Sequence, residues 1–113
     1  MKIGHFNATP EQMWKWFKMP GSDAEFEIKL ITRDEFLKSN ATGDTSLFAS
    51  HVARNLVRGF KNLLDCNGVP IPNTPENRIV IMQSLDVWSF VQSKLLATAE
   101  WSDEGKDVSG SVS

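Results

Sequence analysis

The chain has 113 residues, the size of one ordinary globular domain. Its formal net charge of -2 gives no overall attraction for nucleic acid or anionic lipid. The single cysteine excludes an internal disulfide, and no apolar run approaches the ~20 residues that cross a bilayer. We therefore expect a soluble intracellular protein.

Two short runs around a proline-glycine turn predict a β-hairpin near the N-terminus. Residues 13–19 are rich in aromatic side chains, and Pro20 and Gly21 follow them as a turn signal. Over most of residues 25–31, apolar and charged side chains alternate, as in a half-buried strand. The alternative is that Thr9 caps a helix and residues 10–17 are helical and fully packed.

The two faces of the first predicted strand differ in chemistry. Trp14 and Trp16 share one face, whereas Met13, Phe17 and Met19 share the other. A hairpin over a small helical core buries only one face, so the other exposes large aromatic or methionine side chains. Exposed patches of this kind mark interaction sites, and methionine adapts to varied apolar partners.

Two helices are predicted in the middle of the chain. Thr32 and Glu35 form a capping box that begins a helix over about residues 33–40. From residue 45 or 46 to Leu64, apolar side chains recur at helical spacing and predict one long amphipathic helix. The glycine inside it, Gly59, suggests that another helix crosses closely there. The stripe consists of Ala49, Val52, Ala53, Leu56, Val57, Phe60, Leu63 and Leu64.

Two further helices are predicted after a rigid connection. Asn67 and Gly68 turn the chain, and the prolines that follow stiffen it. Thr74 and Pro75 begin the third helix as its N-cap and first residue. Asp86 is expected to cap the last helix after a short interruption at residues 84–86. Its apolar face consists of Trp88, Val91, Leu95 and Ala99.

The sequence thus predicts a mainly helical α+β fold, with an N-terminal β-hairpin followed by about four helices. Residues 1–101 form a single globular domain in this prediction. Residues 102–113 are small and polar and are expected to be a disordered tail.

No constellation of residues predicts catalysis, a metal or a cofactor. His5, His51 and Cys66 are the soft ligands of the chain, and their spacing matches no zinc motif. On the predicted helix, His51 would lie ~20 Å along the axis from Cys66, too far for a nucleophile and its base. We therefore expect no catalytic, metal-binding or cofactor-binding residues and do not expect an enzyme.

A basic stripe leaves a DNA-binding regulator open as an alternative. Arg54, Arg58 and Lys61 fall on one side of the predicted long helix, as in a recognition helix. The acidic pI of about 5.6 argues against this alternative and favours a solvated helix face.

The chain resembles the small tail assembly chaperones of long-tailed bacteriophages over about residues 14–96. The resemblance rests on the hairpin leading into its capping box, on a glycine-centred segment, and on a turn with prolines before a capped helix. These segments are residues 16–36, residues 57–65 and residues 67–77.

The resemblance implies a protein made in the host cytoplasm that binds the tape-measure protein, helps to recruit the tail-tube protein and is absent from the mature virion. It also implies self-association and, in many members, a longer frameshifted product. A small structural tail or neck protein is the alternative within the phage particle. The predicted protein-binding residues are Trp14, Trp16, Phe17 and Met19 of the hairpin, with Val69 and Ile71 on the proline loop.

Overall fold

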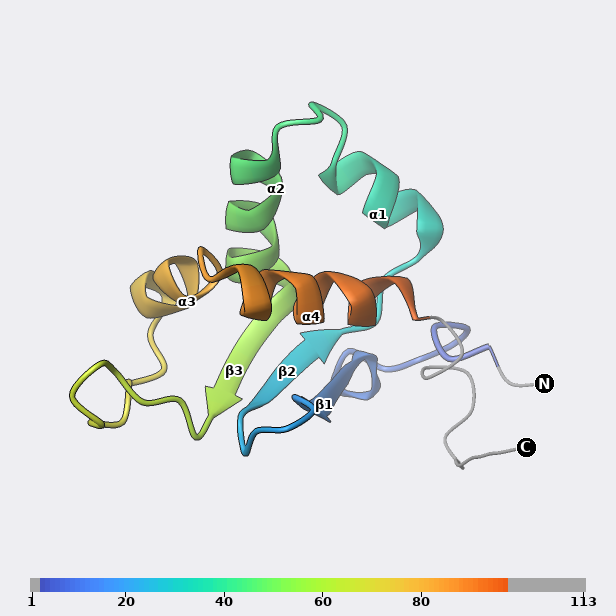
Figure 1. Ribbon diagram of the computed structural model, residues 1–113. Coiled ribbons are helices and arrows are strands. Elements are labelled where there is room, and N and C mark those ends of the chain that lie inside the picture. Colours follow the sequence, from blue (N-terminus) through green and yellow to red (C-terminus); the bar gives the residue numbers. More distant parts are fainter. Residues whose placement is uncertain (1–2, 98–113) are drawn as a thin grey trace.

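The structure is a computed structural model that describes residues 3–97 (Figure 1). It confirms a mainly helical α+β fold. Its strands form one antiparallel sheet in the order β1-β2-β3, and α4 crosses the sheet and contacts β2. The strands are β1 (Trp14–Lys18), β2 (Glu25–Lys29) and β3 (Val57–Lys61). The helices are α1 (Arg33–Ser39), α2 (Thr45–His51), α3 (Pro75–Ile81) and α4 (Leu85–Leu96). A short 3-10 turn, η1 (Glu11–Met13), precedes β1, and a π-helical turn, η2 (Val52–Leu56), continues α2.

The predicted β-hairpin is confirmed. In β1, Trp16 lies opposite Glu27 of β2, and Phe17 lies opposite Phe26. Gly21 provides the turn with a backbone φ of +75°, a conformation that other residues rarely adopt. The alternative of a helix over residues 10–17 is reduced to η1, which ends at Met13.

The predicted long helix is wrong in its second half. Helical structure continues from Thr45 through α2 and η2 to Leu56, and Val57 then turns to an extended backbone with φ −129° and ψ 119°. Residues 57–61 form β3, which pairs antiparallel with β2. The sheet therefore has a third strand that the sequence analysis assigned to a helix.

A β-bulge in β3 explains the helix-like spacing of its apolar residues. Phe60 lies opposite Phe26 and Val57 lies opposite Ile28, so Arg58 is an extra residue in the strand. The extra residue places two side chains three positions apart on the buried face of the sheet. An interval of three is also the interval of a helix face, and the pattern alone does not separate the two structures.

Most of the predicted helix starts are confirmed. Thr32 accepts a hydrogen bond from the amide of Glu35, whose carboxylate accepts one from the Thr32 amide. Thr74 accepts from the amide of Asn77 at the start of α3. The expected cap of α4 needs correction: Ser84 holds the N-cap position, and Asp86 lies in the first turn.

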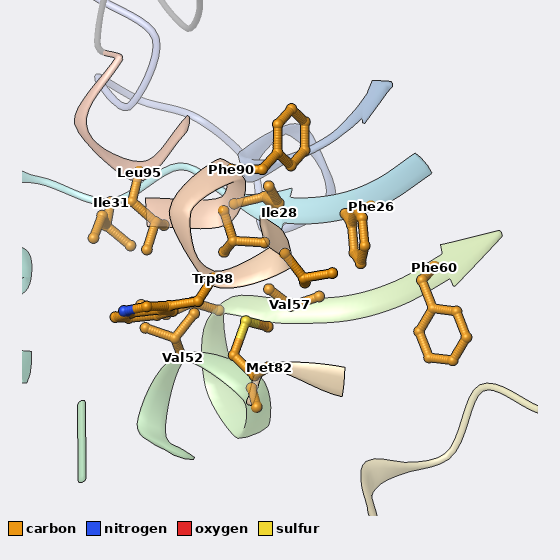
Figure 2. Packing of buried hydrophobic residues seen from close by; sticks show 14 of the residues in the cluster. Phe26, Ile28, Ile31, Val52, Val57, Phe60, Met82, Trp88, Phe90 and Leu95 are labelled. Carbon is orange, nitrogen blue, oxygen red and sulfur yellow. The ribbon is translucent and has the colours of Figure 1, made fainter. Parts of the chain in front are cut away.

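The core lies between the sheet and the helices. Figure 2 shows Ile28 and Val57 from the strands beside Val52 and Trp88 from the helical layer. Aromatic rings extend the packing, with the Phe48 and Trp88 rings in edge contact at a centroid separation of 5.3 Å. In the described part of the chain, all the buried residues are hydrophobic or glycine. The predicted tail at residues 102–113 and Ala99 of the last predicted helix lie outside the described residues.

Candidate protein-binding surfaces

The face of the sheet that points away from the core carries both hairpin tryptophans. Trp16 is 40% exposed, and Trp14 is half-buried on the same side of β1. Neighbouring strands contribute charged residues and one glycine to this face. We call this surface the tryptophan face and define it by Trp14, Trp16, Glu27, Arg58, Gly59 and Lys61.

The Trp16 indole lies across β2 and reaches β3. A Cβ atom placed on Gly59 would sit 3.3 Å from Cη2 of Trp16, closer than ordinary van der Waals contact. The same Cβ would meet Glu27 Oε1 at 3.5 Å. Gly59 is therefore explained by the approach of an indole across the sheet, and the predicted crossing of another helix at this residue is wrong.

Cations cover both indole rings. The guanidinium carbon of Arg58 lies 4.7 Å from the Trp14 ring centroid. The Lys61 Nζ lies 4.2 Å from the Trp16 ring centroid. Both distances are within the ~6 Å over which a cation is attracted to an aromatic face.

Arg58 is also the electrostatic centre of this surface. Its two terminal nitrogens donate to the carboxylate oxygens of Glu11 at 2.9 and 2.8 Å, and Nη2 also donates to Glu27 at 2.9 Å. Hydrogen bonding by Arg58, followed by its charge, lowers the pKa of Glu11. The same two carboxylates raise the pKa of Arg58, mainly through their hydrogen bonds. The bulge residue thus ties β3 to β2 and to η1.

The six predicted binding residues do not lie on one surface. Phe17, Met19 and Ile71 are half-buried and pack against the core. Val69 is 54% exposed, but its loop lies beyond β3, at the other edge of the sheet from β1 (Figure 1). Trp14 and Trp16 form the remaining pair. Partner binding at all six residues stays a prediction.

The loop that carries Val69 is a tight hairpin-like turn. The Asp65 carboxylate accepts hydrogen bonds from the amides of Asn67 and Val69 at 2.8 and 3.0 Å. Leu64 and Pro70 form an isolated bridge beside it. These contacts explain the order of the loop without a ligand, and they hold Val69 and Leu64 toward solvent.

A groove between three helices is a surface that the sequence analysis missed. Its volume is about 270 Å³, and most of the side chains that line it are apolar or small. Leu85, at the rim, is 79% exposed. No sequence motif predicts this groove, because its walls come from α2 and from the α3–α4 junction, which are distant in sequence. Its lining consists of Thr45, Ser46, Ala49, Ser50, Ile79, Met82, Gln83, Leu85 and Trp88.

The predicted basic stripe does not exist as a helix face. Arg54 lies in η2, whereas Arg58 and Lys61 lie on β3. Arg58 is paired with two carboxylates, and Lys61 covers an indole ring. These three residues therefore do not form the recognition helix that the alternative of a DNA-binding regulator requires, nor the solvated helix face that the sequence favoured.

Within residues 3–97, no group of three or more histidine, cysteine, aspartate or glutamate side chains is placed to hold a metal ion. No helix in that same range has the length and hydropathy required to span a membrane. Cys66 is exposed, and Nδ1 of His51 lies 3.2 Å from the side-chain nitrogen of Asn55.

No protein-family model, curated protein or solved structure matches the chain.

Proposed function

We propose that this protein is a non-enzymatic tail assembly chaperone of a bacteriophage, which shields apolar helical segments of a tape-measure protein in the host cytoplasm. The resemblance of residues 14–96 to that family supports the biological setting. The single structural observation that supports a chaperone is the open apolar groove between α2, α3 and α4.

The groove suits a helix better than a small molecule. Its volume of about 270 Å³ lies below the ~300–1,000 Å³ of typical small-molecule pockets. On the α2 side its walls are short side chains, among them Ser46, Ala49 and Ser50, which allow another backbone to approach. Amphipathic helices bind such grooves by inserting apolar side chains spaced three or four residues apart.

The rim of the groove adds exposed apolar area that a partner can contact. Leu85, which lines the groove, is 79% exposed although it is a large apolar side chain. A partner helix would cover this area, while the groove itself remains small. Small contact areas give weak and reversible binding, which is what temporary shielding of a client requires.

The test is co-expression with the tape-measure protein encoded in the same genome, followed by affinity capture of this chain. We expect capture of the tape-measure protein and reduced light scattering from its aggregates. The Leu85→Glu variant should capture at least tenfold less tape-measure protein, because removing a carboxylate from water against the apolar groove is unfavourable. Ser50→Phe should act in the same way by filling it.

A matched control separates groove binding from general loss of surface hydrophobicity. Leu37 on α1 is also a large exposed apolar residue, at 56%, and it does not line the groove. Leu37→Glu should capture the client as well as the unmodified protein does. An equal loss of capture in Leu85→Glu and Leu37→Glu would refute the groove as the binding site. A loss of capture only in Trp14→Ala or Trp16→Ala would show that the tape-measure protein binds the tryptophan face.

The proposal also separates a chaperone from a structural tail or neck protein. A chaperone leaves the particle before assembly is complete. Mass spectrometry of purified virions should therefore detect the tape-measure protein without this chain. Recovery of this chain in stoichiometric amounts from virions would support the structural alternative.

A further inference from the structure

The outer edge of β1 presents unpaired backbone groups. Met13 and Met19 direct their backbone groups to β2, since Leu30 donates to the Met13 carbonyl and Met19 donates to the Ala24 carbonyl. By alternation, Trp14, Trp16 and Lys18 direct theirs away from β2. The Trp14 amide donates to the Glu11 carbonyl.

Five groups on this edge remain available. Within residues 3–97, the amides of Trp16 and Lys18 and the carbonyls of Trp14, Trp16 and Lys18 have no hydrogen-bond partner. An edge of this kind is a template for another strand.

Side chains and a bulge interrupt the opposite edge of the sheet. The outward carbonyl of Arg58 in β3 accepts hydrogen bonds from Asn73 Nδ2 at 3.3 Å and from Arg78 Nη1 at 3.4 Å. Arg78 also donates to Asn73 at 2.6 Å, which fixes both side chains over β3. The bulge at Arg58 and these two side chains thus interrupt the β3 edge, whereas β1 is a regular strand and the better edge for accepting another.

The sequence of β1 is complementary to itself in one antiparallel register. When Trp16 lies opposite Trp16 of a second copy, Trp14 lies opposite Lys18, and Lys15 lies opposite Phe17. Each pair is then aromatic with aromatic or aromatic with cation, and both kinds attract. Sliding the strands by two residues away from the turn would instead place Lys15 opposite Lys15, and like charges repel. Sliding them by two residues toward the turn would place Phe17 opposite Phe17 and leave only residues 16–18 of each strand paired.

The same register satisfies four of these five groups. The Trp16 amide of each copy donates to the Trp16 carbonyl of the other, and each Lys18 amide donates to the other copy's Trp14 carbonyl. The Lys18 carbonyl stays exposed to water, because the Trp14 amide that lies opposite it is already bonded within its own chain. This register is favoured because it pairs the whole of β1, residues 14–18, without like charges opposite each other.

We propose that two copies of this chain associate through their β1 strands, antiparallel and centred on Trp16, to form one continuous six-stranded sheet. The inference does not depend on the proposed function, because it uses the sheet edge and not the helical groove.

Amide exchange tests the pairing in the unmodified protein. We expect the apparent mass in analytical ultracentrifugation to rise with concentration from 12.7 kDa toward twice that value. Over the same range, NMR should show slower hydrogen exchange at the amides of Trp16 and Lys18. The amides of Lys15 and Phe17, which face β2, should exchange at an unchanged rate. A monomer throughout, or a dimer in which these rates do not alternate, would overturn the proposal.

Two variants test the register: one changes a side-chain pair, and the other removes a backbone hydrogen-bond donor. Trp16→Lys places like charges opposite each other and should weaken association at least ~10-fold. Lys18→Pro removes one outward amide, a change that edge strands tolerate, and should weaken it without loss of the circular dichroism signal. Leu85→Glu is the control and should associate like the unmodified protein. Association unchanged in both β1 variants would refute this edge as the interface.

These variants also separate the two proposals. Trp16→Lys should lose the dimer and still capture the tape-measure protein through the groove of each monomer. Leu85→Glu should lose the client and keep the dimer. Failure of either proposal therefore leaves the other standing.

Discussion

Replacing Gly59 with valine tests the assignment of residues 57–61 to a strand packed under an indole. Gly59 has an ordinary backbone φ, so the change introduces no backbone strain. In the predicted helix, valine would be slightly better than glycine, because glycine is ~1 kcal/mol worse than alanine. In the observed strand, the first added atom already lies 3.3 Å from the Trp16 ring.

The magnitude follows from two opposing effects. A β-branched residue in a strand gains up to ~1 kcal/mol over glycine. Two further methyl groups must fit among Trp16, Asn73 and Glu27, and overpacking of this kind costs about 1–3 kcal/mol. The net expectation is a loss of about 1 kcal/mol in the free energy of unfolding. Gly59→Ala should be nearly neutral, because the partly exposed ring can tilt by a few tenths of an ångström.

Urea denaturation monitored by circular dichroism measures both variants, and a double-mutant cycle assigns the cause. In a Trp16→Ala background the clash is absent, so Gly59→Val should become neutral or stabilising. We expect a coupling free energy of at least ~1 kcal/mol between the two sites. A stabilised single variant, or the same loss with and without Trp16, would refute the packing argument.

Three other perturbations test the core, a cap and the ion pair. Phe26→Ala should lower the free energy of unfolding by about 3–5 kcal/mol in urea, because Phe26 is 1% exposed. Thr32→Ala should lower it by ~1 kcal/mol, measured in the same way. Glu11 has a lowered pKa, so its pair with Arg58 stabilises the fold above the ordinary value of 4.5 and loses that effect as pH falls through the lowered value. The melting temperature of Glu11→Gln should therefore fall less on acidification than that of the unmodified protein.

Local signals in the sequence were sufficient for the hairpin and for most helix starts. A proline-glycine turn between two short runs has few alternatives, and Gly21 does adopt the positive φ that the turn requires. Thr32 and Thr74 cap their helices because a hydroxyl acceptor one residue before a helix satisfies an otherwise unpaired amide. These features depend on neighbours within a few residues, so they can be read without tertiary structure.

The third strand could not be recognised in this way. Val57 and Phe60 share a face only because Arg58 bulges, and the bulge depends on pairing with β2, some thirty residues earlier. The same pairing explains the contacts of Arg58, which bonds to Glu27 of β2 and to Glu11 of η1. The groove was missed for the same reason, because its walls meet only after folding.

The groove and the β1 edge together lead to a prediction about avidity. Antiparallel pairing that keeps like faces together relates the two copies by a two-fold axis perpendicular to the sheet. Both helical grooves then lie on one side of the six-stranded sheet, and both tryptophan faces lie on the other. A client with two apolar helical segments on a flexible linker could occupy both grooves at once, with a gain of ~10²–10⁴ in affinity over one segment.

The avidity prediction can be measured by titrating single and tandem client segments against the unmodified protein and Trp16→Lys. The tandem segment should bind the unmodified dimer far more tightly than the single segment does. Trp16→Lys should bind both segments with similar, weak affinity, because each monomer offers one groove. An equal advantage of the tandem segment in both proteins would show that the second contact lies on the same monomer, and the β1 dimer would then play no part in holding the client.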